Sequence, residues 1–333
     1  MANEFTLADY ALTATPLTRA VVKTWREASP ILDMLKFKTT NNLTEEGVRF
    51  NSLPTVPWRK IGESFSQLKV IPDPWKERVH FMGAKIDIPY EYVKANSLTD
   101  NRAVQSEAIL KGSAFGFNDA FFNNGPLDDE DAIIGLFYRI NNDMGANQLV
   151  NAALDVSPNT AVTDWHLQLF DKVDDLLDRV DGESSQKTLF MGRTLYYRFV
   201  SALRKANQLF TEDYLGRKLV TYGMGGAKIF QAGYKVDQST QILGVVEATS
   251  AGLTGGALSS MYAVRFGEPY LGGWCQEMPT ADDVGLLEDR VNFRTVVRFT
   301  TGAPAWAHLN KVMALACGER AARLVTLDLY RIT

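Results

Sequence analysis

Residues 37–93 decide what kind of fold the chain can have, and they read FKTTNNLTEEGVRFNSLPTVPWRKIGESFSQLKVIPDPWKERVHFMGAKIDIPYEYV. Short alternating segments, such as 47–52 and 85–90, run between closely spaced prolines. Proline cannot donate a backbone hydrogen bond to a sheet, so we interpret these segments as edge strands or broken strands. Five of the chain's twelve prolines lie here: Pro54, Pro57, Pro72, Pro74 and Pro89.

A long β-arm of this composition has no means of building a core of its own. An isolated two-stranded hairpin is only marginally stable in water. We therefore expect the arm to lie either on its own domain or on a neighbouring copy, and the second option points toward assembly rather than catalysis. Its tip, Trp58–Ser64, is expected to be polar because it carries turn residues and charges of both signs.

The segment before the arm, residues 1–36, is predicted to be a helical N-terminal arm. Pro16 is well placed at the start of a helix over 17–28, which Pro30 then interrupts. The apolar stripe of this helix is Val21, Val22 and Trp25, and its remaining face carries Arg19, Lys23 and Arg26.

The segment after the arm carries the clearest helix pattern in the chain. Ser97–Asp100 is typical of a capping box, and Gly125 followed by Pro126 marks the end of a helix of some 22 residues. Gly112 and Gly116 inside it each cost about 1 kcal/mol relative to alanine. They indicate close approach of another element, or a bend.

The remaining chain alternates helix and strand patterns, which predicts an α+β body. A helix should begin at Asp164, with its buried stripe at Leu169, Phe170, Val173, Leu176, Leu177 and Val180. A strand at 188–191 and a helix at 193–206 follow. The glycine-rich region 220–273 should contain strands at 227–230, 241–246 and 261–266 and an exposed loop at 249–256, and a long strand should cover 291–299.

The composition is that of an ordinary globular protein, with 333 residues of which 46% are hydrophobic and 22% charged. The net charge of −4 gives no electrostatic sign of a dedicated DNA or membrane binder. Residues 1–7 do not resemble a signal peptide, and no apolar run approaches the roughly 20 residues of a membrane span, so we expect a cytosol-like compartment. Cys275 and Cys317 are predicted to be reduced structural cysteines.

Motifs that carry chemistry are missing from the sequence. His80, His166 and His308 have no metal-ligand spacing, and neither HExxH nor GxSxG occurs. The acidic run 128–131 lacks the alternating ligands and glycine of a calcium loop, so a solvated turn is favoured over a cation site. Gly223–Lys228 does not fit either phosphate-loop pattern. We therefore predict no catalytic, cofactor-binding or metal-binding residue, although these absences do not exclude an activity.

The order of these elements resembles the major capsid proteins of tailed bacteriophages. The resemblance covers nearly the whole chain and lies in element order plus several short phrases, each weak alone and moderately specific together. The phrases are Gly47–Phe50, Lys85–Pro89, Ile134–Leu136, Ser260–Gly267, and Gly285–Arg294 followed by 296–302.

The resemblance implies an α+β fold of the Hong-Kong-ninety-seven-like type. In that fold the N-arm, here 1–36, and the extended β-loop, here 37–93, reach over neighbouring subunits. The spine helix and peripheral domain would occupy 94–214, the axial domain 215–275, and the returning strands of the peripheral domain 276–333.

The resemblance also implies a function and partners. Such proteins assemble as hexamers and pentamers into an icosahedral virion shell around double-stranded DNA, which they hold without sequence-specific binding. Expected partners are a separate scaffolding protein, or in its place a scaffolding segment already removed from the chain, together with a portal protein and, as an option, a decoration protein. No membrane and no cofactor are expected, and synthesis is expected in the bacterial host cytoplasm. The residues expected to make assembly contacts are Trp58, Arg59, Lys60, Glu63, Phe65, Arg19 and Arg26.

Two alternatives stay open at this point. One is an encapsulin-like compartment of the same fold, which would enclose a cargo enzyme instead of DNA. The other is a soluble α+β enzyme or ligand-binding protein, which would need a preformed pocket and an arm folded back onto its own body. If the arm serves assembly, its apolar residues should be only partly buried within one chain, among them Phe50, Phe65, Ile86 and Ile88.

Overall fold

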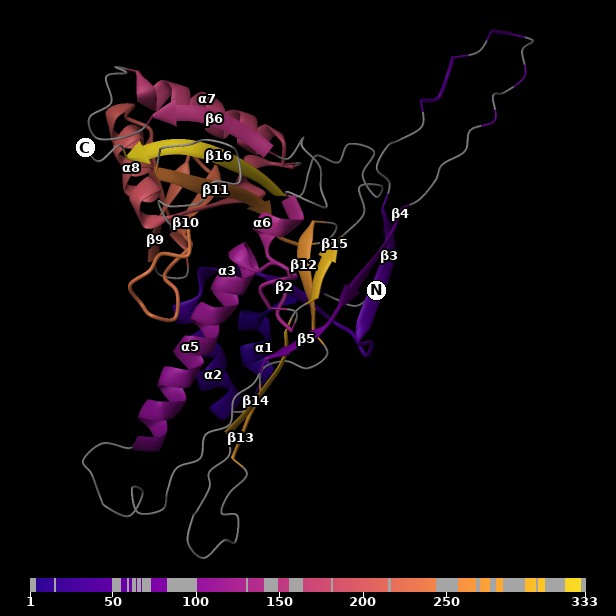
Figure 1. The fold of residues 1–333 in the computed structure, drawn as a ribbon, viewed down its shortest axis with the longest axis vertical. Coiled ribbons are helices and arrows are strands. Elements are labelled where there is room, and N and C mark those ends of the chain that lie inside the picture. The colour runs from indigo at the N-terminus through magenta and orange to yellow at the C-terminus, as the bar shows by residue number, and fades with distance from the viewer. Residues whose placement is uncertain are drawn as a thin grey trace, which may run out of the picture.

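The protein is an α+β molecule from which one β-arm projects (Figure 1). The arm begins as an antiparallel pair, β3 (Thr44–Arg49) and β4 (Asp73–Arg78). The computed structural model describes residues 4–14, 16–49, 55–58, 60–61, 64, 67, 73–82, 101–129, 131–140, 149–155, 164–180, 182–214, 217–243, 257–267, 270–275, 280–283, 297–303, 305–308 and 321–330.

The N-terminal region packs against the body of its own chain. It comprises β1 (Phe5–Thr6), α1 (Leu7–Thr13), α2 (Pro16–Ala28), α3 (Pro30–Met34) and β2 (Lys36–Thr39). The predicted helix over 17–28 is confirmed as α2, and its stripe is buried. The indole Nε1–H of Trp25 donates to the Ser113 hydroxyl at 2.8 Å, which ties α2 to the following long helix. The described part of this region therefore contributes to the core instead of projecting from it.

The long helix α5 (Asn101–Asn123) ends where the sequence predicts. Leu110, Ala114, Phe117, Phe121 and Phe122 are its buried residues. Of the two expectations for Gly112 and Gly116, close approach is wrong among the described residues, because a Cβ at either position would meet none of them within 4 Å; the bend stays a prediction. A turn at 126–128 and the short helix α6 (Leu136–Tyr138) follow. The expected capping box at 97–100 lies outside the described residues.

A seven-stranded mixed sheet separates two hydrophobic cores. Along β7, Leu189 and Met191 face helices α7 (Trp165–Asp178) and α8 (Arg193–Lys205), whereas Phe190 faces Phe122 of α5 at 5.7 Å between ring centroids. Successive strand residues point to opposite faces, so β7, in the middle of the sheet, is buried on both sides. The strands in spatial order are β6 (Leu149–Asp155), β16 (Ala321–Tyr330), β11 (Ala257–Arg265), β7 (Lys187–Met191), β10 (Ala227–Gln231), β9 (Arg217–Tyr222) and β8 (Leu209–Tyr214).

The helix predicted from Asp164 is confirmed as α7, with all six residues of its predicted stripe buried. Gly182 beyond it has φ +99°, a backbone conformation that favours glycine. The strands and helix predicted at 188–191, 193–206, 227–230 and 261–266 are also present. A 3-10 turn, η3 (Ser184–Gln186), leads into β7.

Two smaller sheets lie at the base of the arm. One has the order β1-β2-β12-β15, with β12 (Leu271–Cys275) and β15 (Ala305–His308); the other has the order β13-β14-β5, with β13 (Thr280–Asp283), β14 (Val297–Ala303) and β5 (His80–Met82). Residues 37–39 of β2 belong to the range 37–93, yet they pair with β12 of the body.

Two strand predictions are only partly met in this region. The strand expected over 241–246 is wrong for its described part, 241–243, which forms one isolated bridge and buries Ile242 and Leu243 in the core. The strand expected over 291–299 is described from Val297. The return segment 85–90 and the loop 249–256 lie outside the described residues. No helix in the described parts of the chain has the length and apolarity needed to cross a membrane.

Candidate assembly surface: the arm and the cavity at its base

The base of the arm is anchored to the body by stacked tryptophans. Trp75 of β4 stacks on Trp274 of β12 with ring centroids 5.4 Å apart and planes 26° from parallel. Gly47 of β3 lies opposite Trp75, and a Cβ at this position would overlap the indole ring. Pro74 is tolerated in β4 because the described sheet has only two strands and both are edges.

A buried ion pair provides a second anchor. Arg139, which follows α6, pairs with Glu77 of β4, and their side chains are only 3% and 12% exposed. Arg139 Nη2 donates to Glu77 Oε2 at 3.0 Å, and its Nε donates to the carbonyl oxygen of Ile134 at 2.9 Å. The N–H of the buried Val79 donates to the carbonyl oxygen of Leu43 at 2.9 Å, which closes the base of the hairpin. The orientation of the arm is therefore set by its own chain.

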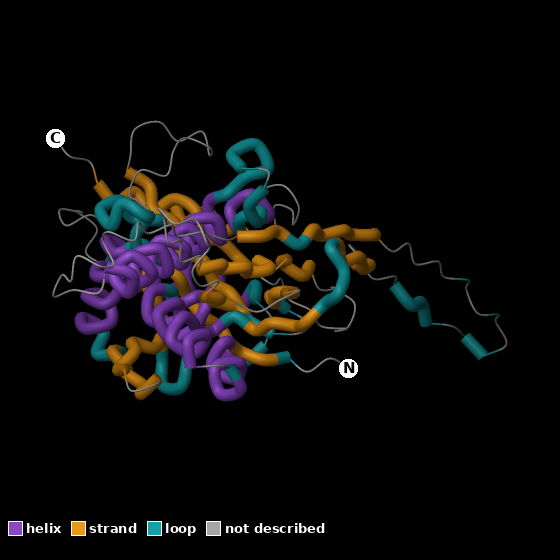
Figure 2. The backbone as a smooth tube through the Cα atoms, turned by 90° about the horizontal axis from the view of Figure 1, so that it is seen from below, coloured by secondary structure: helices purple, strands orange, loops and turns teal. Residues whose placement is uncertain are grey.

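The tip of the arm has the opposite environment. The described pieces of this segment lie far from the body in both views (Figures 1 and 2). Val56 is 73% exposed, and the side chains of Trp58 and Ile61 are fully exposed at 101% and 105%. Tryptophan is a residue type enriched at the energetic centres of protein interfaces, and exposed apolar groups of this size mark contact surfaces.

The predicted contact residues do not form one cluster. Trp58 and Lys60 are exposed at the tip, whereas Arg59, Glu63 and Phe65 lie outside the described residues, as do Phe50, Ile86 and Ile88. The Arg19 guanidinium donates to the carbonyl oxygens of Ala11 at 3.0 Å and of Leu12 at 3.4 Å, so it holds the end of α1.

Arg26, the other predicted contact in the N-terminal region, is engaged within the chain. Its Nε lies 2.6 Å from Asp33 Oδ1, and both side chains are largely buried. Burial, reinforced by the charge of Asp33, raises the pKa of the adjacent Tyr214 to about 12. Arg19 and Arg26 therefore have structural roles in the monomer, and an assembly role for either stays a prediction.

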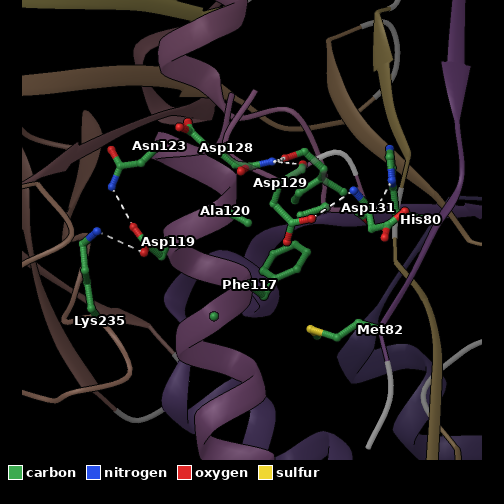
Figure 3. A pocket seen from close by; sticks show the side chains of 14 residues that line it. His80, Met82, Phe117, Asp119, Ala120, Asn123, Asp128, Asp129, Asp131 and Lys235 are labelled. Atoms are coloured by element: carbon green, nitrogen blue, oxygen red, sulfur yellow. Dashed lines mark hydrogen bonds and ion pairs between the residues drawn. The ribbon is translucent and has the colours of Figure 1, made fainter. Parts of the chain in front are cut away.

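A cavity of about 660 Å³ opens beside the arm base, between α5, the turn after it and β5 (Figure 3). Its floor is apolar, with Phe117, Ala120 and Ile133 among the lining residues. Its rim is acidic, because Asp128, Asp129 and Asp131 are all exposed there. The size lies in the range of natural binding pockets.

The acidic turn that forms this rim is held in place by hydrogen bonds. Asn124 Nδ2 donates to the carbonyl oxygens of Asp129 at 3.1 Å and of Ile133 at 2.9 Å. The N–H of Gly125 donates to Asp128 Oδ2 at 3.0 Å. His80 Nδ1 lies 2.9 Å from the carbonyl oxygen of Asp131, so the Nδ1–H tautomer donates to it. These bonds join the turn both to α5 and to the strand that follows the arm.

The far wall of the cavity carries a neutralised carboxylate. Asp119 of α5 pairs with Lys235 at 3.1 Å, and it also accepts from Asn123 Nδ2 at 2.8 Å. Figure 3 shows this pair on the side of the helix away from His80. The predicted solvated turn over 128–131 is confirmed for Asp128, Asp129 and Asp131. The cavity itself was not predicted, because its floor comes from residues of α5 and of the loop that follows, which only the fold brings together.

Other residues considered for chemistry have structural surroundings. Within the described ranges, no group of three or more His, Cys, Asp or Glu is placed to hold a metal ion. Residues 223–226 form the turn between β9 and β10, with φ +82° at Gly223 and +65° at Gly225, and Lys228 Nζ lies 4.7 Å from the Tyr214 ring centroid. Cys275 is buried, and burial raises the pKa of its thiol to about 12. Cys317 lies outside the described residues.

Comparison with known proteins finds similarity in structure but not in sequence. No family model matches the chain, and no curated protein matches it. A chain of the holo-SrpI encapsulin complex from Synechococcus elongatus PCC 7942 is similar, with a TM-score of 0.57 and 12% identity over 96% of this chain and 95% of that one.

Two further solved structures are similar over comparable lengths. A chain of Microbacterium phage Oxtober96 has a TM-score of 0.54 and 14% identity, covering 89% of this chain and 90% of that one. A chain of the capsid of the native GTA particle has a TM-score of 0.52 and 12% identity, covering 90% of each. These likenesses show that the chain has the Hong-Kong-ninety-seven-like fold, as the element order predicted.

Proposed function

We propose that this chain is the major capsid protein of a tailed bacteriophage, which assembles with copies of itself into an icosahedral shell around double-stranded DNA. The observation that carries the proposal is the arm, which is anchored at its base by a buried ion pair and carries a fully exposed tryptophan at its tip. The ion pair fixes the direction of the arm, and the tryptophan presents an apolar surface that another subunit can cover. A connection between subunits needs both properties.

The likeness of the fold to solved structures supports the proposal. Similar chains belong to a capsid and to an encapsulin complex, and the similarity extends over nine-tenths or more of this chain in both cases. The role proposed is thus structural and not enzymatic. The wider set of partners is part of the same proposal: hexamers and pentamers of this chain, a separate scaffolding protein, a portal protein and an optional decoration protein.

A second candidate function is the shell of an encapsulin-like compartment. The similarity to the encapsulin complex, with a TM-score of 0.57, specifically favours it. The two functions share a subunit and differ in content, so purified particles distinguish them. Nucleic acid inside supports the virion, whereas an enclosed enzyme with little nucleic acid supports the compartment.

The third reading, a soluble enzyme or ligand-binding protein, is less well supported. It requires an arm folded back around a pocket, whereas the described tip residues lie away from the body (Figure 2). The cavity at the base of the arm is lined by exposed carboxylates, and none of the described residues that line it is a serine, threonine or cysteine.

The test is expression of the full chain, alone and together with a scaffolding protein, followed by light scattering and electron microscopy. The proposal predicts hollow particles or ring-shaped capsomers in at least one of these conditions. A compact monomer in every condition, at concentrations up to the solubility limit, would contradict it.

A further inference from the structure

We propose that a second cavity, which lies between the N-terminal region and the seven-stranded sheet, binds a phosphate group. The cavity has a volume of about 390 Å³, within the range of small-ligand sites. Asp33 and Lys36 line it from the N-terminal region, and Lys228 and Arg265 line it from the sheet. The inference goes beyond the proposed function and does not depend on it, because one subunit contains the whole site.

Lys228 of β10 is the residue on which the inference chiefly rests. It is half-buried, and its Nζ lies 4.7 Å from the centroid of the Tyr214 ring. Among the residues that the structure describes, no carboxylate forms an ion pair with it. Withdrawing an ammonium group from water costs free energy unless other groups compensate, and a ring face compensates only in part. A bound anion would complete the surroundings of Lys228.

The acidic residues at this cavity are already paired with cations of their own. Asp33 Oδ1 lies 2.6 Å from Arg26 Nε, and Glu4 Oε2 lies 3.6 Å from Lys36 Nζ. Each of these pairs is balanced in charge. Neither pair therefore offsets the positive charge of Lys228.

Arg265 of β11 supplies a second cation. Its guanidinium carbon lies 3.7 Å from the centroid of the Tyr270 ring, so stacking holds the plane of the group. A guanidinium has five N–H donors, so Arg265 can keep its contacts within the chain and still donate to a ligand. Planar, bidentate donation is the geometry that arginine offers to phosphate oxygens.

Neutral polar groups complete the lining and favour phosphate over a carboxylate as the ligand. They are Ser185 and Gln186 of η3 and Thr188 of β7. The Thr6 hydroxyl does not belong to this set, because it donates to Asp9 Oδ2 at 2.8 Å. A phosphate group has more acceptor oxygens than a carboxylate, so it can accept from the cations and from hydroxyl or amide donors at the same time.

The cavity at the base of the arm has the opposite surroundings. Asp128, Asp129 and Asp131 are exposed at its rim, and their carboxylates would repel a phosphate group. Phosphate is therefore directed to the second cavity and away from the first.

A phosphate bound in the second cavity would connect two parts of the fold that are distant in the sequence. Lys36 belongs to β2, whereas Lys228 belongs to β10. A ligand that binds only the folded chain raises its stability in proportion to the logarithm of ligand concentration. Phosphate should therefore raise the temperature of unfolding. It should also slow proteolytic removal of the N-terminal region, whose packing against the sheet forms the site.

Isothermal calorimetry of the full-length subunit with inorganic phosphate tests the inference. Sodium chloride at equal ionic strength is the reference, because it screens exposed charges without supplying phosphate. Lys228→Met removes the ammonium group and keeps an unbranched side chain, so it should weaken phosphate binding about 10-fold. Lys218→Met is the matched control and should leave binding unchanged, because Lys218 is an exposed lysine of the adjacent strand β9 that does not line the cavity.

A second variant keeps the test decisive if Lys228→Met disturbs folding. Ser185 is exposed, and Ser185→Phe adds a ring to the lining without changing any charge, so it should block phosphate binding in a folded subunit. Competition with phosphate by adenosine monophosphate and by a short DNA duplex identifies the source of the group. Competition by adenosine monophosphate alone assigns a free phosphate compound, and competition by the duplex as well assigns the DNA backbone.

The outcomes separate this inference from the proposed function. Phosphate binding that is kept in Lys218→Met and lost in Lys228→Met and Ser185→Phe supports the site. Absence of binding by all three probes up to about 10 mM, or equal binding in the wild type and in both cavity variants, overturns it. Failure of the wild-type chain to form particles bears on the proposed function alone, because the calorimetry uses the single subunit.

Discussion

The base and the tip of the arm are parts of one hairpin, yet they have opposite relations to the rest of the chain. At the base, Trp75 stacks on Trp274 and Glu77 pairs with the buried Arg139. At the tip, Trp58 and Ile61 have no cover from the described residues. A two-stranded segment without a core can be oriented by its own chain at one end only, and the other end needs a partner.

The stability of the single chain and the association between chains should therefore depend on different residues of the arm. Residues at the base should affect the free energy of unfolding of the single chain. Residues at the tip should affect association between chains. Substitutions that fail to divide in this way would break the comparison, and those that do divide would sharpen it.

The largest effect on stability is expected for Glu77→Ala. It leaves the Arg139 guanidinium buried without its partner, which costs about 3–5 kcal/mol of unfolding free energy. Urea unfolding of the soluble subunit, followed by circular dichroism, measures it. The double variant Glu77→Leu with Arg139→Met is the control, because it removes both charges and should recover most of the loss. A single variant within 0.5 kcal/mol of wild type would show that the base is not anchored by this pair.

A smaller loss is expected for Gly47→Ala. The new methyl group would overlap the Trp75 ring and displace it from Trp274, at a cost of about 1–3 kcal/mol. Gly112→Ala in α5 is the matched control, because its Cβ would meet nothing, and removing a helical glycine should stabilise by up to about 1 kcal/mol. Equal effects of the two substitutions on the urea midpoint would argue against stacking at the base.

Alkaline pH should also weaken the body next to the arm base. Burial raises the pKa of the Cys275 thiol to about 12, against about 8.5 in an unfolded chain. The contribution of this group to stability is therefore fully present below pH 8.5 and is lost as the pH rises toward 12. The unfolding free energy should fall less steeply above pH 8.5 in Cys275→Ala than in wild type, whereas Trp58→Ala should keep the wild-type slope.

The smallest effect on subunit stability is expected for Trp58→Ala. The side chain is fully exposed, so the free energy of unfolding should stay within about 0.5 kcal/mol of wild type. The same variant should assemble poorly when examined by light scattering. A Trp58→Ala subunit that assembles normally but unfolds early would reverse the proposed division between tip and base.

Much of the fold follows from patterns that are local in the sequence. The stripe from Leu169 to Leu177 has helical period and forms the buried face of α7, and Val180 just beyond the helix is buried as well. Of the two alternatives predicted at Gly112, a close approach or a bend, close approach is wrong among the described residues, because a glycine in a helix does not reveal whether a neighbour is present. The strand predicted at 241–246 was wrong over 241–243 because a short apolar run has no period that distinguishes a strand from a buried loop.

The candidate site was predictable only in part. The proline spacing identified the arm, and the acidic run identified the solvated turn. Neither pattern indicated that the turn forms the rim of a cavity, because the cavity is lined both by Phe117 and Ile133 and by β5. The link between the turn and β5 depends on the hydrogen bond between His80 and Asp131. The pairing of Arg139 with Glu77 spans 62 residues and carries no local pattern.

Residue-specific hydroxyl-radical footprinting of Trp58, in the free subunit and in assembled material, tests the central claim most directly. We expect rapid oxidation of Trp58 in the free subunit, where its side chain is fully exposed, and strong protection after assembly. Trp274, which is stacked at the base of the arm, should change little and serves as the internal reference. Assembled particles in which Trp58 is oxidised as fast as in the free subunit would contradict the claim that another copy completes the arm.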